Sequence, residues 1–270
     1  MSFSRRVLVF LLILLFLLFI PKAGKFVQHW RNRIDSICPD WKSSSSIDVE
    51  QFEKCFYTDV NEDFWLDENI RHRAFKNLLN SSSLIIEVGG NRGHDTERFI
   101  ELYDPFIISY EPLSSMNKKL EEKFLNRTKI QVQPFGLGNR TRQTLIERVG
   151  QENIASSIFH SVSNQQTTNV ERIQIFNIVD VIHQIRKNST GFIDMITMNC
   201  EGCEFEILPA LMKNDLIRSF RIIQIATHVS LIPSGPCIYC EIQNHLRRTH
   251  RSIYHYHKLW EAWILRDNMS

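Results

Sequence analysis

The chain has little glycine and proline and almost no excess of charge of either sign. Its 270 residues include 10 Gly, 8 Pro and 6 Cys, and its formal net charge is +2. This composition excludes collagen, low-complexity disorder and small disulfide scaffolds. The near-neutral charge also argues against a nucleic-acid partner, which would call for a basic excess. What the chain does have is 43% hydrophobic residues, enough for one full-sized core.

One segment lacks polar residues altogether. Residues 7–20 read VLVFLLILLFLLFI and follow Arg5 and Arg6, which is the pattern of a targeting segment. As a helix it would span about 21 Å, a length that fits a signal-peptide core or a short anchor. The sequence that follows is a poor cleavage site, and the arginines favour a cytosolic amino end. We therefore predict a cytosolic tail and uncleaved signal-anchor over residues 1–25, with a secreted chain as the alternative.

Either version places the rest of the chain in the secretory pathway, in the Golgi or endoplasmic reticulum lumen, or outside the cell. Glycosylation triplets of the N-x-[ST] type agree with this and occur at Asn80, Asn126, Asn139, Asn188 and Asn268. An oxidising compartment favours disulfides. Cys38 and Cys55 would close a loop and stabilise the fold by about 3 kcal/mol.

Two Cys-x-x-Cys pairs, at 200–203 and 237–240, are expected to be bridged to each other by a disulfide. A four-cysteine zinc site is the alternative, but the 33 residues between the pairs exceed the usual spacing. No metal is therefore predicted.

Hydrophobic patterns divide the chain into a stem with a flanking helix (residues 26–80) and one domain (residues 81–270). Within the domain, strands alternate with helices, which demands crossover connections and a parallel sheet covered on both faces. The predicted fold is a doubly wound, mostly parallel Rossmann-like α/β domain. We expect strands at 84–88, 106–110, 130–134, 143–149, 172–178, 192–198 and 220–226, helices at 62–80, 94–103, 114–125, 179–187 and 204–214, and a closing hairpin at 253–264.

The turn after the first strand is where such a sheet binds a ligand, and here it reads EVGGNRG from Glu87 to Gly93. A nicotinamide fingerprint would need glycines at positions 91 and 94, which are absent. The E-x-G-x-x-x-G spacing instead resembles motif I of class I S-adenosylmethionine-dependent methyltransferases. The resemblance implies a cofactor site at this turn. Its expected residues are Glu87 near the donor's ammonium, Gly89, Gly90, Asn91 and Gly93 along the backbone, and Glu111, 22 residues after Gly89, on the ribose hydroxyls.

Further blocks follow in order and together resemble the FkbM-type methyltransferases. These blocks are Tyr110-Glu111-Pro112, Pro134 to Gly138, Ala155 to Ile158 and Asn199 to Leu208. The resemblance implies methyl transfer from S-adenosylmethionine to a hydroxyl oxygen of a sugar, lipid or other small molecule. The predicted partners are thus a small-molecule or glycan acceptor and, through the N-terminal segment, the membrane.

One position departs from the family pattern, which has Asp where this chain has Asn199. An amide cannot act as a general base at neutral pH, so Glu201 or His228 would have to take that role. The candidate catalytic residues are therefore Asn199, Glu201 and His228. Two alternatives remain: a binding module that keeps the fold without the reaction, and a Rossmann-type transferase that uses a sugar nucleotide.

Overall fold

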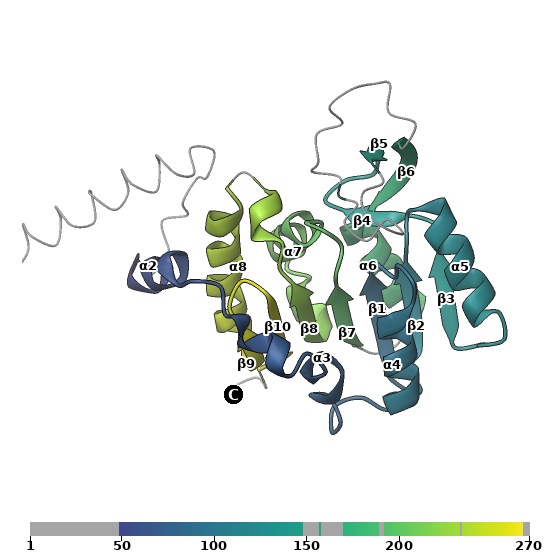
Figure 1. Ribbon diagram of the computed structural model, residues 1–270, viewed down its shortest axis with the longest axis horizontal. Helices are drawn as coiled ribbons and strands as arrows, with labels where there is room; N and C mark the ends of the chain where they lie inside the picture. The colour runs from purple at the N-terminus through teal and green to yellow at the C-terminus, as the bar shows by residue number, and fades with distance from the viewer. Residues whose placement is uncertain (1–48, 148–156, 158–169, 189–191, 233, 267–270) are drawn as a thin grey trace, which may run out of the picture.

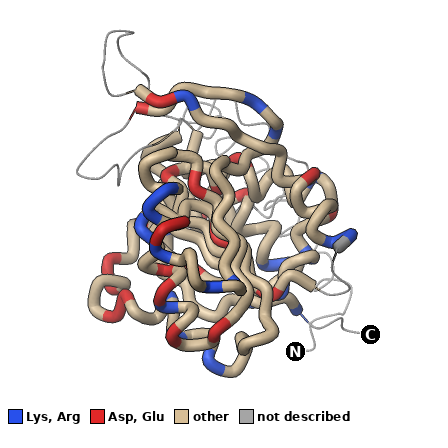
Figure 2. Tube along the Cα trace, turned by 90° about the vertical axis from the view of Figure 1, so that its right-hand side faces the viewer, with Lys and Arg blue, Asp and Glu red and all other residues tan. Residues whose placement is uncertain are grey.

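The structure is a computed structural model that describes residues 49–147, 157, 170–188, 192–232 and 234–266. The predicted signal-anchor, Cys38 and Asn268 lie outside these residues. Among the described residues, no helix is long and apolar enough to cross a membrane. Figure 2 shows that basic and acidic positions are interspersed over the molecule, as the small net charge leads one to expect.

A seven-stranded sheet in the order β3-β2-β1-β7-β8-β10-β9 forms the centre of the molecule (Figure 1). Six of these strands run in one direction, and only β10 runs in the opposite direction, antiparallel to both β8 and β9. The strands are β1 (Leu84–Val88), β2 (Phe106–Tyr110), β3 (Ile130–Gln133), β7 (Ile193–Met198), β8 (Phe220–Ala226), β9 (His250–Tyr256) and β10 (Trp260–Leu265). The mostly parallel α/β sheet and the closing hairpin are therefore confirmed.

Helices cover both faces of the sheet because neighbouring residues of a strand point to opposite sides. Ile86 belongs to a core with α2, α6, α7 and α8, whereas Ile85 belongs to a second core with η1, α4 and the β9–β10 hairpin. The helices are α2 (Val49–Tyr57), η1 (Glu62–Leu66), α3 (Ile70–Arg73), α4 (His94–Tyr103), α5 (Ser114–Phe124), α6 (Ile178–Asn188), α7 (Glu204–Lys213), η3 (Ile217–Ser219), η4 (Val229–Leu231) and α8 (Gly235–Thr249).

Two of the predicted strands lie outside the main sheet. They form β5 (Arg142–Glu147) and β6 (Val170–Asn177), which join β4 (Gly136–Gly138) in a separate three-stranded sheet of order β4-β6-β5. The two strands pair antiparallel with each other. The small sheet rises beside the carboxyl edge of the main sheet (Figure 1).

Two expectations about helices are wrong. The continuous helix expected over 62–80 is interrupted, because η1 ends at Leu66 and α3 has only four residues. The segment around Cys237, which is not among the predicted helices, forms the helix α8.

Both predicted disulfide pairings that involve described cysteines are wrong. Cys55 pairs with Cys240, which joins α2 to α8, and Cys200 pairs with Cys203. Cys55 therefore does not pair with Cys38, and no bond links the two Cys-x-x-Cys pairs. The physical reason is tertiary: α2 packs against α8 in one core and brings Cys55 to Cys240.

Removing the Cys55–Cys240 bond should destabilise the protein considerably. The bond links residues 185 positions apart, so its loss frees a long loop in the unfolded chain. We expect Cys55→Ala with Cys240→Ala to lower the free energy of unfolding by about 2–5 kcal/mol, measured by urea denaturation under oxidising conditions. Cys200→Ala with Cys203→Ala removes a bond between residues only three positions apart; it is the control and should lose much less. Equal losses would contradict this account.

Candidate active site

A cavity of about 270 Å³ opens where the strand order reverses, between the carboxyl ends of β1 and β7. The chain leaves β1 toward β2 on one side, while β7 lies on the other side. Loops that diverge at such a switch point leave a crevice, and ligands bind there in open α/β sheets. Residues from the β1 turn, the end of β2, the loop after β7 and the small sheet line this cavity.

The turn after β1 has its shape because two glycines permit it. Gly89 has φ +91°, and a Cβ there would lie 2.2 Å from the backbone oxygen of Asn199. Gly93 has φ +74°, and a Cβ there would lie 2.7 Å from the Phe124 ring. Of the predicted turn residues, Gly89, Gly90 and Asn91 line the cavity and Gly93 does not. The glycines thus serve close packing of the protein's own chain as well as the shape of the cavity.

Glu87, expected to meet the donor's ammonium, is directed elsewhere. Its side chain is buried, accepts hydrogen bonds from the hydroxyls of Thr96 (2.6 Å) and Ser109, and does not line the cavity. Burial raises the pKa of Glu87 to about 7, although both hydroxyls act in the opposite direction. A partly protonated carboxyl beneath the turn is a weak partner for an ammonium group, so the geometry does not favour direct contact.

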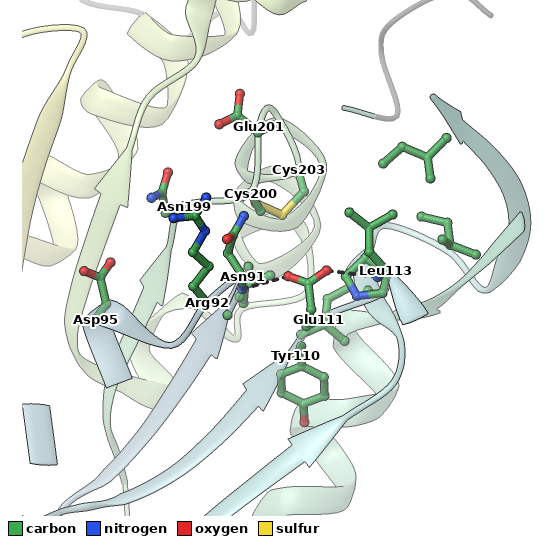
Figure 3. Close-up of a pocket in the computed structure, with 18 of the residues that line it drawn as sticks. Asn91, Arg92, Asp95, Tyr110, Glu111, Leu113, Asn199, Cys200, Glu201 and Cys203 are labelled. Atoms are coloured by element: carbon green, nitrogen blue, oxygen red, sulfur yellow. Dashed lines mark hydrogen bonds between the residues drawn. A yellow bond between two sulfur atoms is a disulfide. The ribbon is translucent and has the colours of Figure 1, made fainter. Parts of the chain in front are cut away.

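Glu111 lies where the ribose-binding carboxylate was expected. It follows β2, is buried, and lines the cavity. Its Oε2 accepts from the backbone N–H of Asn91 at 2.8 Å and its Oε1 from that of Leu113 at 2.9 Å (Figure 3). Burial raises the pKa of Glu111, and the two N–H donors act against it. Each oxygen keeps a second lone pair, so the carboxylate can still accept from two ligand hydroxyls.

Apolar side chains form the wall next to Glu111. Leu113, Ile146, Ile173 and Ile175 line the cavity and form a small core of their own with Met116. Such a wall suits the flat face of an aromatic base. The period-two alternation over residues 172–178 predicts a strand with one apolar face. It does not predict that this face lines the cavity.

The loop after β7 carries two of the three candidate catalytic residues into the cavity. Asn199 and Glu201 line it, and their loop faces the turn that carries Asn91 (Figure 3). Glu201 has φ 53° inside the short loop closed by the Cys200–Cys203 disulfide. Cys200, Cys203 and Glu204 lie close together, but a disulfide leaves neither sulfur as a thiolate. With Cys240 bonded to Cys55, the four-cysteine zinc alternative is excluded.

His228 follows β8 and lies between two carboxylates. Its Nδ1 and backbone N–H both contact Oε1 of the buried Glu204 at 2.9 Å, and its Nε2 is 3.5 Å from Oε1 of Glu201. Burial lowers the pKa of His228, but hydrogen bonds and charge from Glu201 and Glu204 outweigh it and raise the pKa to about 10. Of the two candidate bases, His228 with this pKa carries its proton at neutral pH, and Glu201 is the one that lines the cavity.

Two residues that the sequence analysis did not select also line the cavity. Arg71 in α3 and Asp95 in α4 form an ion pair, with Nη1 and Oδ1 at 2.8 Å. Burial raises the pKa of Asp95, but the hydrogen bond from His72 and the charge of Arg71 outweigh it and lower the pKa. No local signal marks this pair, because the two residues are 24 positions apart and meet only in the fold.

Comparison with known proteins places residues 87–266 under a family model described as "Methyltransferase FkbM domain". No curated protein matches the chain. Similar solved structures include an O-methyltransferase from Bacillus cereus in complex with SAH (9% identity, 89% of this chain, 100% of that chain, TM-score 0.41). Another is an rRNA methylase from Streptococcus thermophilus (8% identity, 73% of this chain, 94% of that chain, TM-score 0.41). A third is the fibrillarin pre-rRNA processing protein of Methanococcus jannaschii (12% identity, 70% of this chain, 68% of that chain, TM-score 0.39).

The charge on His228 should make stability depend on pH. Because the pKa is about 10 in the folded protein and 6.5 ordinarily, the folded state holds a proton between these values that the unfolded state releases. We expect the stabilisation from His228 to be complete below about pH 6.5 and to fall as pH rises toward 10, by at most about 1.4 kcal/mol per pH unit.

The measurement is urea denaturation from pH 6 to 10 on the wild type and on His228→Gln, in which this slope should be missing. His183→Gln, on an exposed position of α6, is the control and should keep it. Parallel curves for all three proteins would show that His228 is not charged in the folded state.

Proposed function

The chain belongs to the FkbM-domain methyltransferase family, and from this we propose that it transfers a methyl group from S-adenosylmethionine to a hydroxyl oxygen of a secretory-pathway acceptor. The acceptor classes we propose are glycans, lipids and other small molecules, and not nucleic acids. The observation that carries the proposal is the buried Glu111 carboxylate, which faces the cavity at the end of β2 with two lone pairs still available.

The residues around the cavity fit an adenine nucleoside. Glu111 can accept from both ribose hydroxyls, and the wall of Leu113, Ile146 and Ile173 can pack against the base. The turn at Gly89 and Gly90 lies between this wall and the loop of Asn199. The nucleoside would therefore bind across the switch point, with its sulfur end toward the loop after β7.

When bound, S-adenosylmethionine supplies a methyl group on a sulfonium sulfur, and loss of the methyl group leaves this sulfur as a neutral thioether. The protein has to align the acceptor oxygen with that methyl group and remove the hydroxyl proton. Glu201 is the base that we propose, because it is the carboxylate of this loop that lines the cavity. His228 positions Glu201 from outside the cavity, at 3.5 Å. Asn199 can orient the acceptor by hydrogen bonding but cannot take its proton.

We propose a lumenal domain held at the membrane by residues 7–20. The disulfides Cys55–Cys240 and Cys200–Cys203 support an oxidising compartment. Asn80, Asn126 and Asn139, the three glycosylation triplets whose side chains the structure describes, are all exposed. Both features agree with a place in the secretory pathway.

A second candidate function follows from Asn199 alone. With an amide in place of the family's Asp, the fold could bind the donor without transferring its methyl group. The two candidates differ in one outcome, which is whether bound donor is converted to S-adenosylhomocysteine when acceptor is present.

Donor binding should depend on the Glu111 carboxylate. Loss of two hydrogen bonds to a charged acceptor should weaken S-adenosylmethionine binding by roughly 10- to 100-fold in Glu111→Ala, with a smaller loss in Glu111→Gln, which keeps one carbonyl oxygen. Titration calorimetry on the full-length chain measures this, and Glu122→Ala, on an exposed site of α5, is the control. Tight binding of a sugar nucleotide and none of S-adenosylmethionine would overturn the proposed function.

Methyl transfer should depend on the Glu201 carboxylate. We expect Glu201→Gln to reduce transfer by roughly 100- to 10,000-fold, because general-base assistance is worth about that much, while donor binding changes little. The assay follows radiolabelled methyl transfer to glycan and lipid fractions of secretory membranes, with the exposed Glu121→Gln as control. Donor binding by the wild type without any transfer would favour the inactive binding module.

A further inference from the structure

The cavity has a second polar end, opposite Glu111. There the ion pair of Arg71 and Asp95 lines the wall, contributed by the short helix α3 and by the first turn of α4. Asp95 lies on the other side of Asn91 from Glu111 (Figure 3). An elongated ligand whose ribose contacts Glu111 would therefore direct its other end toward this pair or toward the loop after β7.

Arg71 is held in place on two sides. Its Nη1 contacts both Asp95 oxygens, at 2.8 and 2.9 Å, and its guanidinium carbon lies 5.1 Å from the centre of the Trp260 ring. Asp95 is fixed in turn, because Nε2 of the buried His72 lies 2.9 Å from Oδ1. The guanidinium is thus preorganised, and a ligand would not have to order it.

Part of this guanidinium remains available to a ligand. Within the part of the chain that the structure describes, Nε and Nη2 of Arg71 have no hydrogen-bond partner. The side chain is 22% exposed, and its residue borders the cavity. The ion pair with Asp95 uses only Nη1, so it does not account for the other two nitrogens of the guanidinium. The remaining donors form one side of a planar fork, which is the geometry that binds a carboxylate.

We propose that Arg71 and Asp95 form the subsite for the amino-acid end of the methyl donor. Arg71 would bind the donor's carboxylate through Nε and Nη2, and Asp95 would lie beside its ammonium group. The inference rests on the proposed function and deepens it, since it assigns the end of the donor that Glu111 does not reach. In this proposal Asp95 takes the place of Glu87 as the partner of the ammonium group, because Glu87 is hydrogen-bonded to Thr96 and Ser109 beneath the turn.

The test compares two ligands that differ only in the carboxylate. Titration calorimetry on the full-length chain in mild detergent would measure S-adenosylmethionine and decarboxylated S-adenosylmethionine. We expect the wild type to bind the decarboxylated ligand roughly 10- to 100-fold more weakly, since a charge-assisted hydrogen-bonded pair is lost. In Arg71→Met this preference should disappear, because the variant should bind both ligands about equally.

Two further variants control for folding and for charge. Arg73→Met removes an exposed arginine of the same helix, paired with Asp67, and should keep the wild-type preference. Arg71→Lys keeps the charge without the fork and should retain an intermediate preference. The wild-type comparison needs no variant, so the inference can be tested even if Arg71→Met does not fold.

Three outcomes would overturn the inference, each for a different reason. Equal binding of the two ligands by the wild type would show that no residue recognises the carboxylate. Unchanged donor affinity but lost methyl transfer in Arg71→Met would assign Arg71 to an acid group of the acceptor. Failure of the wild type to bind either ligand would overturn the proposed function itself.

Discussion

The close approach of two backbone segments at the carboxyl edge of the sheet determines the site. The turn after β1 and the loop after β7 lie so near that a Cβ on Gly89 would be 2.2 Å from the Asn199 oxygen. The contact is possible because Gly89 has no side chain and adopts φ +91°. Asn199 donates its N–H to the Val88 oxygen at 3.0 Å, so the two loops continue the pairing of their strands. The cavity residues of both loops are therefore fixed relative to each other by main-chain packing.

The sequence predicts those parts of the fold and site that depend on local pattern. The buried strands at 84–88 and 220–226 are mostly apolar, and α4 shows its helical period in Thr96, Phe99 and Tyr103. The place of Glu111 at the cavity could be predicted because, in the methyltransferases that the turn resembles, an acidic residue stands at the end of the second strand, which is a position defined along the chain. The motif spacing carries that information without any knowledge of tertiary contacts.

The parts that were missed depend on contacts between distant segments. Arg71 meets Asp95 only because α3 packs beside α4, and Cys55 meets Cys240 only because α2 packs on α8. For His228, a base role was inferred from its place at the end of a strand, but its pKa is set by Glu204 and Glu201, which approach from another loop. Charge state is a property of the assembled surroundings, so residue type and strand position could not give it.

The departure at Asn199 can be weighed in the same terms. The fold uses the main chain of this residue, its oxygen against Gly89 and its N–H on Val88, and no hydrogen bond from another described residue holds its side chain. An amide can therefore replace a carboxylate here without disturbing the site. The loop keeps its own charges one turn further on, where Glu204 accepts from Gly202 N–H at 3.1 Å and from His228, and His228 in turn faces Glu201. Because this arrangement does not include the Asn199 side chain, the carboxylate of Glu201 can be held at the cavity with either Asn or Asp at position 199, and that is the physical basis for proposing Glu201 as the base.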